Sequence, residues 1–179
     1  MNKINKYLLS GLAAAVLASI YSNGALAADA NVTASAEVLA PLAIAQTIPM
    51  DFGQVAGSAT AATTVVLDTA NTTTPSGGAF ADATATSAAF NVTGEDGLTY
   101  TILLPDDTTV TIDDGAGGGT PMTVTAFNDN LGGTNAAPST PTVASATSPN
   151  FTVGATLNIG INQTAGTYSG PYTVTVEYQ

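Results

Sequence analysis

The sequence predicts an all-β sandwich, and three observations support this prediction. Apolar residues alternate with Thr in many short segments, β-branched residues are abundant, and Gly and Pro separate the segments. A period of two places every second side chain on the same face of a strand. Several short strands at this spacing are typical of a sandwich or barrel, and no segment after the first 27 residues shows a helical apolar stripe.

The individual strands are predicted from this alternation and from the turn residues around it. They cover residues 63–67, 89–93, 98–104, 108–112, 122–127, 151–159 and 172–178. Residues 94–97, Gly-Glu-Asp-Gly, separate two of these strands and predict a hairpin turn. Residues 70–79 and 132–149 are rich in turn-forming residues and predict long loops.

The first 27 residues have the features of a secretory signal peptide. Lys3 and Lys6 precede an apolar run from Leu8 to Ile20, and small residues follow up to Ala27. The run is shorter than the roughly 20 apolar residues of a spanning helix, and Ala-Leu-Ala is typical of a cleavage site. We therefore expect an exported chain that begins at Ala28. The exported part would be one domain of about 150 residues without membrane insertion.

The composition after the leader restricts the chemistry. All thirteen Asp and Glu residues lie beyond residue 27, whereas both basic residues lie before it, and there is no His or Cys. A chain without cationic side chains cannot neutralise phosphates, so we expect no nucleic-acid binding. It also lacks the usual general base, the thiol and amine nucleophiles, and any disulfide. We expect no enzyme, no catalytic residue and no cofactor.

Two carboxylate pairs could in principle bind Ca²⁺. Asp106-Asp107 and Asp113-Asp114 offer hard oxygen ligands, but their spacing is not that of an EF-hand loop. Solvated carboxylates in turns are the preferred interpretation, and we expect no metal site.

The C-terminal segment has the clearest pattern in the chain. Tyr172, Val174, Val176 and Tyr178 alternate with polar residues, and Gly166 is the fourteenth residue from the end. Each apolar residue would contribute roughly 1.5–3 kcal/mol if fully buried. The penultimate aromatic, the alternation and this Gly resemble the C-terminal signature of chaperone–usher pilins. The sandwich that this resemblance implies is immunoglobulin-like (pilin-like) and lacks one strand.

The N-terminal segment of the mature chain supports the same resemblance. Val32, Ala34, Ala36 and Val38 share one face of a segment that is followed by Pro41 and by Met50-Asp51-Phe52-Gly53. This pattern is similar to the spore coat protein U family and archaic pilins, and closer still to a related uncharacterised family of secreted bacterial domains. Coat-U-type pilins usually carry paired Cys residues, which this chain lacks.

The resemblance implies different roles for the N-terminal and C-terminal segments of the chain. Residues 28–40 would be an extension whose four apolar residues act as a donor strand, and residues 41–179 would form the sandwich. Gly166 and the Tyr172–Tyr178 strand would border the groove that the donor fills. The implied partners are copies of the same chain, a periplasmic chaperone and an outer-membrane usher. The implied route leads through the periplasm to the cell surface or an extracellular fibre. The implied function is a structural subunit of a surface fibre (pilus or fimbria), serving adhesion or biofilm formation.

One alternative stays open at this point. Residues 31–39 could be an ordinary first strand of a self-complete, monomeric secreted domain, either carbohydrate-binding or an accessory surface protein.

Overall fold

The computed structural model describes residues 28–108, 110–115, 117–143 and 151–179. The chain divides into two units between Glu37 and Val38. In the first unit, residues 28–37 are exposed and form no strand. All described strands belong to the second unit, Val38–Gln179. The proposed signal peptide lies outside the described residues.

The second unit contains eleven strands, and the described residues include no helix. The predicted all-β sandwich class is therefore confirmed. The strands are β1 (Ala43–Ile48), β2 (Val55–Ala56), β3 (Thr63–Leu67), β4 (Thr73–Ser76), β5 (Phe80–Ala81), β6 (Ala88–Thr93), β7 (Tyr100–Leu103), β8 (Thr111–Ile112), β9 (Met122–Asp129), β10 (Phe151–Ile159) and β11 (Thr175–Tyr178). No helix in the described part of the chain is long and apolar enough to span a membrane.

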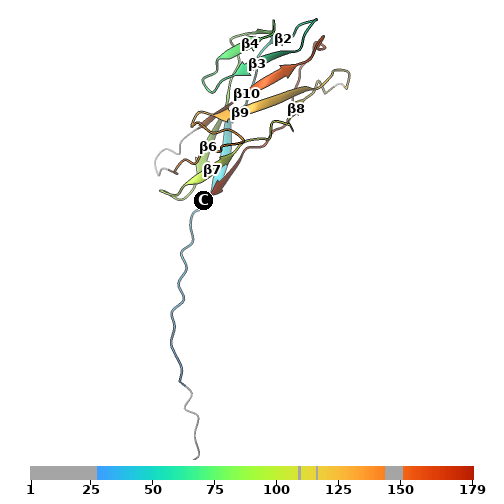
Figure 1. Ribbon diagram of the computed structural model, residues 1–179. Coiled ribbons are helices and arrows are strands. Elements are labelled where there is room, and N and C mark those ends of the chain that lie inside the picture. Colours follow the sequence, from blue (N-terminus) through green and yellow to red (C-terminus); the bar gives the residue numbers. More distant parts are fainter. Residues whose placement is uncertain (1–27, 109, 116, 144–150) are drawn as a thin grey trace, which may run out of the picture. The chain divides into compact units, whose positions relative to one another are not determined.

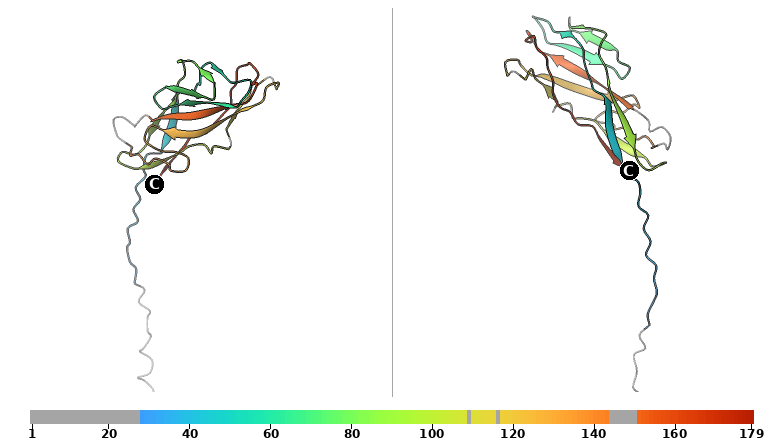
Figure 2. Two further views of the ribbon diagram at one scale, coloured as in Figure 1. Left: turned by 45° about the horizontal axis from the view of Figure 1, so that its top comes forward. Right: turned by 180° about the vertical axis from the view of Figure 1, so that it is seen from behind.

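Strand β10 organises the larger sheet, which has seven strands and is antiparallel (Figures 1 and 2). Its first residues, Phe151–Val153, pair with β6, and Ala155–Ile159 pair with β3. Strand β9 pairs with much of the same stretch of β10 and therefore occupies its other edge. Strand β1 continues the sheet beyond β6, β4 continues it beyond β3, and β8 beyond β9.

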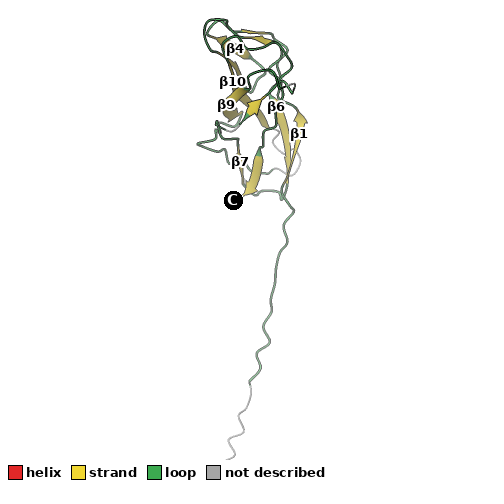
Figure 3. Cartoon of the chain, turned by 90° about the vertical axis from the view of Figure 1, so that its right-hand side faces the viewer, coloured by secondary structure: helices red, strands yellow, loops and turns green. Residues whose placement is uncertain are grey.

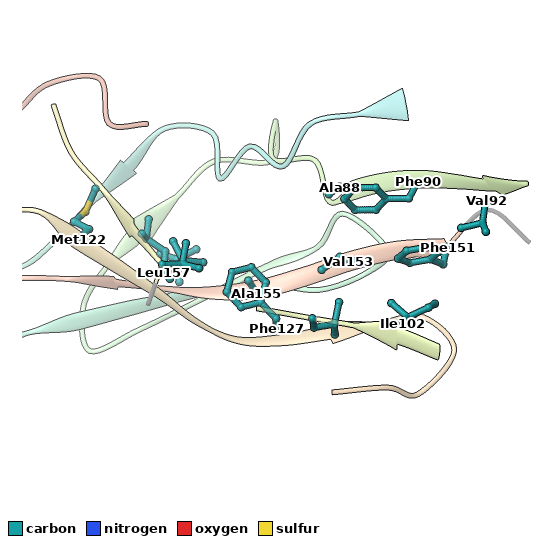
Figure 4. Packing of buried hydrophobic residues seen from close by; sticks show 14 of the residues in the cluster. Ala88, Phe90, Val92, Ile102, Met122, Phe127, Phe151, Val153, Ala155 and Leu157 are labelled. Atoms are coloured by element: carbon teal, nitrogen blue, oxygen red, sulfur yellow. The ribbon is translucent and has the colours of Figure 1, made fainter. Parts of the chain in front are cut away.

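The core lies between this sheet and the two-stranded sheet β7–β11. Tyr100 and Ile102 of β7 are fully buried, and so are Phe151 and Val153 of β10. Figure 4 shows Ile102 beside Phe151, with Phe90 and Val92 of β6 on the other side of that ring, and Phe127 farther along near Ala155. The rings of Phe90 and Phe151 stack with centroids 5.2 Å apart. Burial of this kind contributes about 1.5–3 kcal/mol for each large side chain.

Two local predictions are wrong. Residues 94–97 do not form a hairpin, because β6 pairs with β1 and β10 whereas β7 pairs with β11. The turn instead carries the chain from one sheet to the other. The predicted loop at residues 70–79 contains β4, whose backbone pairs with β3. Strand β1 was not predicted, although it forms an outer strand of the larger sheet beside β6 (Figure 3).

Candidate assembly groove

Strands β1 and β11 each have one edge without a partner strand in the described residues, and the two strands lie close together. Strand β1 pairs with β6 alone, and β11 pairs with β7 alone. The two strands come into contact, but no ladder of hydrogen bonds joins them in the described residues. Unpaired strand edges offer backbone N–H and C=O groups to a further strand. We refer to the space between β1 and residues 170–178 as the groove.

The other edges of the described strands are short, interrupted or covered. Strand β4 carries Pro75, which cannot donate to a ladder. Strands β2, β5 and β8 have two residues each. The second edge of β7 is covered by residues 139–143, since Tyr100 N–H donates to the Pro141 carbonyl and Ile102 N–H donates to the Ser139 carbonyl. Protection of this kind is how native sheets avoid unwanted pairing, and it is absent from the groove.

An open cavity of about 280 Å³ lies at one end of the groove. Most of its lining side chains are apolar. The lining residues are Gln46, Pro49, Met50, Phe90, Gly170, Pro171, Tyr172 and Val174. A site that combines apolar side chains, exposed polar atoms and two open strand edges suits an extended peptide, which contributes backbone hydrogen bonds and alternate side chains.

Tyr172 stands at this cavity and links the groove to the core. Its ring lies 5.7 Å from that of Phe127 between centroids, and its hydroxyl is 3.5 Å from Gln46 Nε2, a long hydrogen bond across the groove. Burial raises the pKa of Tyr172 to about 12, and the contact with Gln46 opposes the rise. The phenol therefore stays neutral at physiological pH.

The opposite end of the groove is closed by a cluster of three hydrogen bonds, which we call the Tyr178 latch. The Glu95 N–H donates to the Tyr178 hydroxyl over 2.5 Å, and this hydroxyl donates to the Ala40 carbonyl over 3.0 Å. The Ala40 N–H in turn donates to the Glu95 carboxylate over 2.9 Å. The latch joins the root of the N-terminal extension, the β6–β7 turn and the last strand.

Gly94 makes room for this latch. A Cβ atom at this position would collide with the Tyr178 hydroxyl and would lie 3.0 Å from Cδ1 of Leu42. Only a residue without a side chain therefore allows Tyr178 to reach the turn.

The predicted C-terminal site residues are largely brought together. Tyr172, Val174, Val176 and Tyr178 are all half-buried, and each packs against the core while its neighbours in sequence are exposed. Regular strand pairing is confined to Thr175–Tyr178, because residues 170–174 have no ladder partner. Gly166 lies apart from them in an exposed loop, where a Cβ atom would make only ordinary contacts with Asp114 and Tyr168. The structure shows no need for Gly there.

The predicted donor residues are unpartnered. Val32, Ala34, Ala36 and Val38 are exposed, and residues 28–42 form no strand. Val32 and Val38 expose 87% and 94% of their surface, so they gain nothing from burial in the isolated chain.

Several groove residues were missed from the sequence. Gln46 and Met50 flank the cavity from the first strand and the loop after it, and Glu95 and Gly94 complete the latch. The alternation of Leu42, Ile44 and Gln46 was the available signal, but two Ala residues weaken it.

The carboxylates do not converge on a metal site. The described residues contain no group of three or more His, Cys, Asp or Glu side chains that could bind one ion. Asp113 and Asp114 instead accept hydrogen bonds from the N–H groups of Gly115 and Gly117, at 2.9 and 3.1 Å. Such bonds are typical of carboxylates that shape turns.

The described strands form an all-β domain in which β1 and β11 each pair on one edge only. Residues 42–178 match the model of a domain family described as Domain of unknown function (DUF4402), and the chain belongs to this family. No curated protein and no solved structure matches the chain.

Proposed function

We propose that this chain is a structural subunit of a bacterial surface fibre, in which the N-terminal extension of one copy fills the groove of the next. The observation that carries the proposal is the pair of unpaired edges on the contacting strands β1 and β11, with an open cavity between Gln46 of β1 and residues 170–172 and Val174, which precede β11. Exported fibres of this type serve adhesion or biofilm formation, and a periplasmic chaperone and an outer-membrane usher are the proposed assembly partners.

The extension has the properties of a donor strand. It is exposed, forms no strand of its own and carries an apolar residue at every second position from Val32 to Val38. Docking would bury these side chains, at about 25 cal/mol for each Å² of apolar surface. It would also pair the free backbone groups of β1 and β11.

The latch favours exchange between copies over self-complementation. Both backbone groups of Ala40 are engaged, the N–H by Glu95 and the C=O by Tyr178. The groove lies beside β1, which begins at Ala43. The chain's own extension would have to reverse within the few residues between Val38 and Ala43, where the structure has no turn.

The alternative is a self-complete secreted domain, and one observation favours it. The core is already closed without an added strand, because Tyr100, Phe127 and Phe151 are at most 1% exposed. Such a domain would remain a monomer with an empty groove.

The experiment is a comparison of polymers formed by exported variants. Placing Asp at Ala34 and Ala36 would bury unpaired charge on docking, at a cost of several kcal/mol for each group. We expect this double variant to lose the heat-sensitive oligomer ladder in cold detergent and the fibres in electron micrographs. A synthetic peptide of residues 28–41 should also compete with polymerisation of the unmodified chain.

The matched control places the same two charges on the opposite face of the segment. Thr33→Asp with Ser35→Asp should export equally well and still polymerise. Fibres from the Ala34 and Ala36 variant, or a stable monomer of the unmodified chain at high concentration, would exclude strand exchange. The self-complete domain would then be the better account.

A further inference from the structure

Residues 129–143, which we call the strap, begin at the end of β9 and continue along the second edge of β7. The Val143 N–H donates to the Leu98 carbonyl over 2.8 Å. The N–H groups of Tyr100 and Ile102 donate to strap carbonyls over 2.9 and 3.0 Å. The strap therefore takes the position that a further strand would have beside β7.

Two more contacts complete this cover. The Asn135 side chain extends it just past the end of β7, because its Nδ2 donates to the Leu104 carbonyl over 3.1 Å. Val143 is 3% exposed and belongs to the core cluster, so the strap is also held by apolar burial. Every second residue of this edge, from Leu98 to Leu104, thus has a hydrogen bond with the strap.

The carboxylate of Asp129 holds the strap from inside the protein. Asp129 is the last residue of β9 and is 3% exposed. Its Oδ1 accepts the N–H groups of Leu131 and Gly133 over 2.8 and 2.9 Å. Its Oδ2 accepts the Ser139 hydroxyl over 2.5 Å, and the Ser139 carbonyl accepts the Ile102 N–H. A single strap residue therefore connects this buried carboxylate to the edge of β7.

The burial of this charge depends on the strap. Residues 28–179 contain no Lys, Arg or His, so no cationic side chain can pair with Asp129. A buried charge without partners is costly, whereas hydrogen bonds to a carboxylate are among the strong ones. Gly133 permits these bonds, because a Cβ atom there would collide with Asp129 Oδ2 and lie 2.6 Å from the Ser139 nitrogen. The charge also acts on β7: burial raises the pKa of Tyr100, and Asp129 raises it further.

Without the strap, β7 would offer a second edge for strand addition. The sheet of β7 and β11 would then have open backbone groups on both sides, and such edges bind extended peptides. In the proposed fibre, the extended peptide that every copy carries is the N-terminal extension, whose Val32 and Val38 are exposed. Each copy supplies one extension, so two acceptor edges per copy would let some copies accept two extensions and others none. The polymer would then branch.

We propose that the strap occupies a second strand-binding edge of the domain, and that Asp129 is the positioning residue that keeps it there. The strap thereby restricts strand exchange to the groove. This consequence for assembly rests on the proposed fibre function. The covered edge itself can be measured on the chain whatever its oligomeric state.

The test compares full chains, isolated after export, that carry a change in or around the carboxylate. Asp129→Ala removes all three hydrogen bonds, and Gly133→Ala disturbs them sterically. Asp129→Asn is the conservative variant, because its oxygen can accept both N–H groups and its NH₂ can donate to the Ser139 hydroxyl. Asp68→Ala is the control, since the Asp68 carboxylate accepts two backbone N–H groups at 2.8 Å in the exposed turn between β3 and β4.

Two measurements report on the edge. Hydrogen exchange followed by mass spectrometry gives the protection of the β7 amides, which include those of Tyr100 and Ile102. A labelled synthetic peptide of residues 28–41 gives the number of open strand edges per chain. Circular dichroism shows whether each variant is folded, and electron microscopy shows whether its fibres branch.

We expect Asp129→Ala and Gly133→Ala to exchange the β7 amides at least about tenfold faster, because bonds to a charged group are lost. Both should bind one more peptide per chain than the unmodified protein does, whereas Asp129→Asn and Asp68→Ala should match the unmodified protein. Unchanged protection of β7, or faster exchange without an additional bound peptide, would overturn the proposal. Where both strap variants are unfolded, Ser139→Ala removes only one of the three bonds and decides by the same measurements.

The consequence for assembly has its own outcome. Branched fibres from the folded strap variants would support the restriction of strand exchange to the groove, and unbranched fibres that bind the additional peptide would overturn it. If the unmodified chain forms no fibres while the strap variants still bind the additional peptide, the fibre function is refuted and the covered edge stands.

Discussion

The Tyr178 latch can be tested by removing a single oxygen atom. Tyr178→Phe keeps the ring but deletes the hydroxyl that accepts from the Glu95 N–H over 2.5 Å and donates to the Ala40 carbonyl over 3.0 Å. Each of these bonds contributes about 0.5–1.5 kcal/mol to stability. The variant should therefore lose about 1–3 kcal/mol in its free energy of unfolding.

Urea denaturation of a purified protein of residues 28–179 measures this loss. Unfolding is followed by circular dichroism because the chain has no Trp. With a slope of about 1–3 kcal/mol per molar, the midpoint should fall by roughly 1 M at unchanged slope. Tyr172→Phe is the matched control on the same segment, because the only hydrogen bond assigned to its hydroxyl is the long one of 3.5 Å with Gln46. We expect its loss to stay below about 0.5 kcal/mol. Equal losses in the two variants would refute the assignment of the latch.

Three further outcomes follow from the geometry. Gly94→Ala should destabilise the domain by displacing Tyr178, and combined with Tyr178→Phe it should cost less than the sum of both changes in a double-mutant cycle. Burial raises the pKa of Tyr172 to about 12, so the neutral phenol supports the folded state below pH 10, and this part of the free energy of unfolding is lost between about pH 10 and 12. In denaturation curves at alkaline pH, Tyr172→Phe should lack this part of the loss of stability. Ala126 has a φ of 53°, so Ala126→Gly should be neutral or stabilising by up to about 1 kcal/mol, whereas Ala89→Gly in β6 should destabilise.

The strands that were predicted most accurately are those in which the alternation of apolar and polar residues lies within the strand itself. The bounds of β3 and β10 agree with the prediction because Val65 and Leu67, like Leu157 and Ile159, alternate with exposed or half-buried residues, and the buried Gly154 is the one interruption. A strand with one face on the core must show this alternation, whatever its partners are.

The elements that were missed depend on partners far away in the sequence. Strand β1 contains two Ala residues, which are depleted in strands, and pairing with β6 determines its structure. The turn at residues 94–97 has the composition of a hairpin, but local composition cannot show which sheet each flanking strand joins.

The groove illustrates the same distinction. Its C-terminal wall was predicted because Tyr172, Val174, Val176 and Tyr178 alternate in one segment. Its other wall and the latch were not, because Ala40 and Tyr178 are separated by 138 positions. A backbone carbonyl can accept a hydrogen bond from a hydroxyl whatever its residue type. No sequence pattern could therefore have revealed this bond.

The charge of the chain limits how its copies can adhere. With no Lys, Arg or His beyond residue 27, the side chains of residues 28–179 cannot form an ion pair between two copies, and thirteen acidic residues repel one another. In the proposed fibre, cohesion between copies would therefore come from apolar burial and from backbone hydrogen bonds, neither of which needs a cation. The open edges of β1 and β11 offer both interactions in one place, and the exposed apolar side chains of the extension are the complementary surface. A fibre joined in this way would tighten rather than weaken as salt rises, because screening removes only the repulsion.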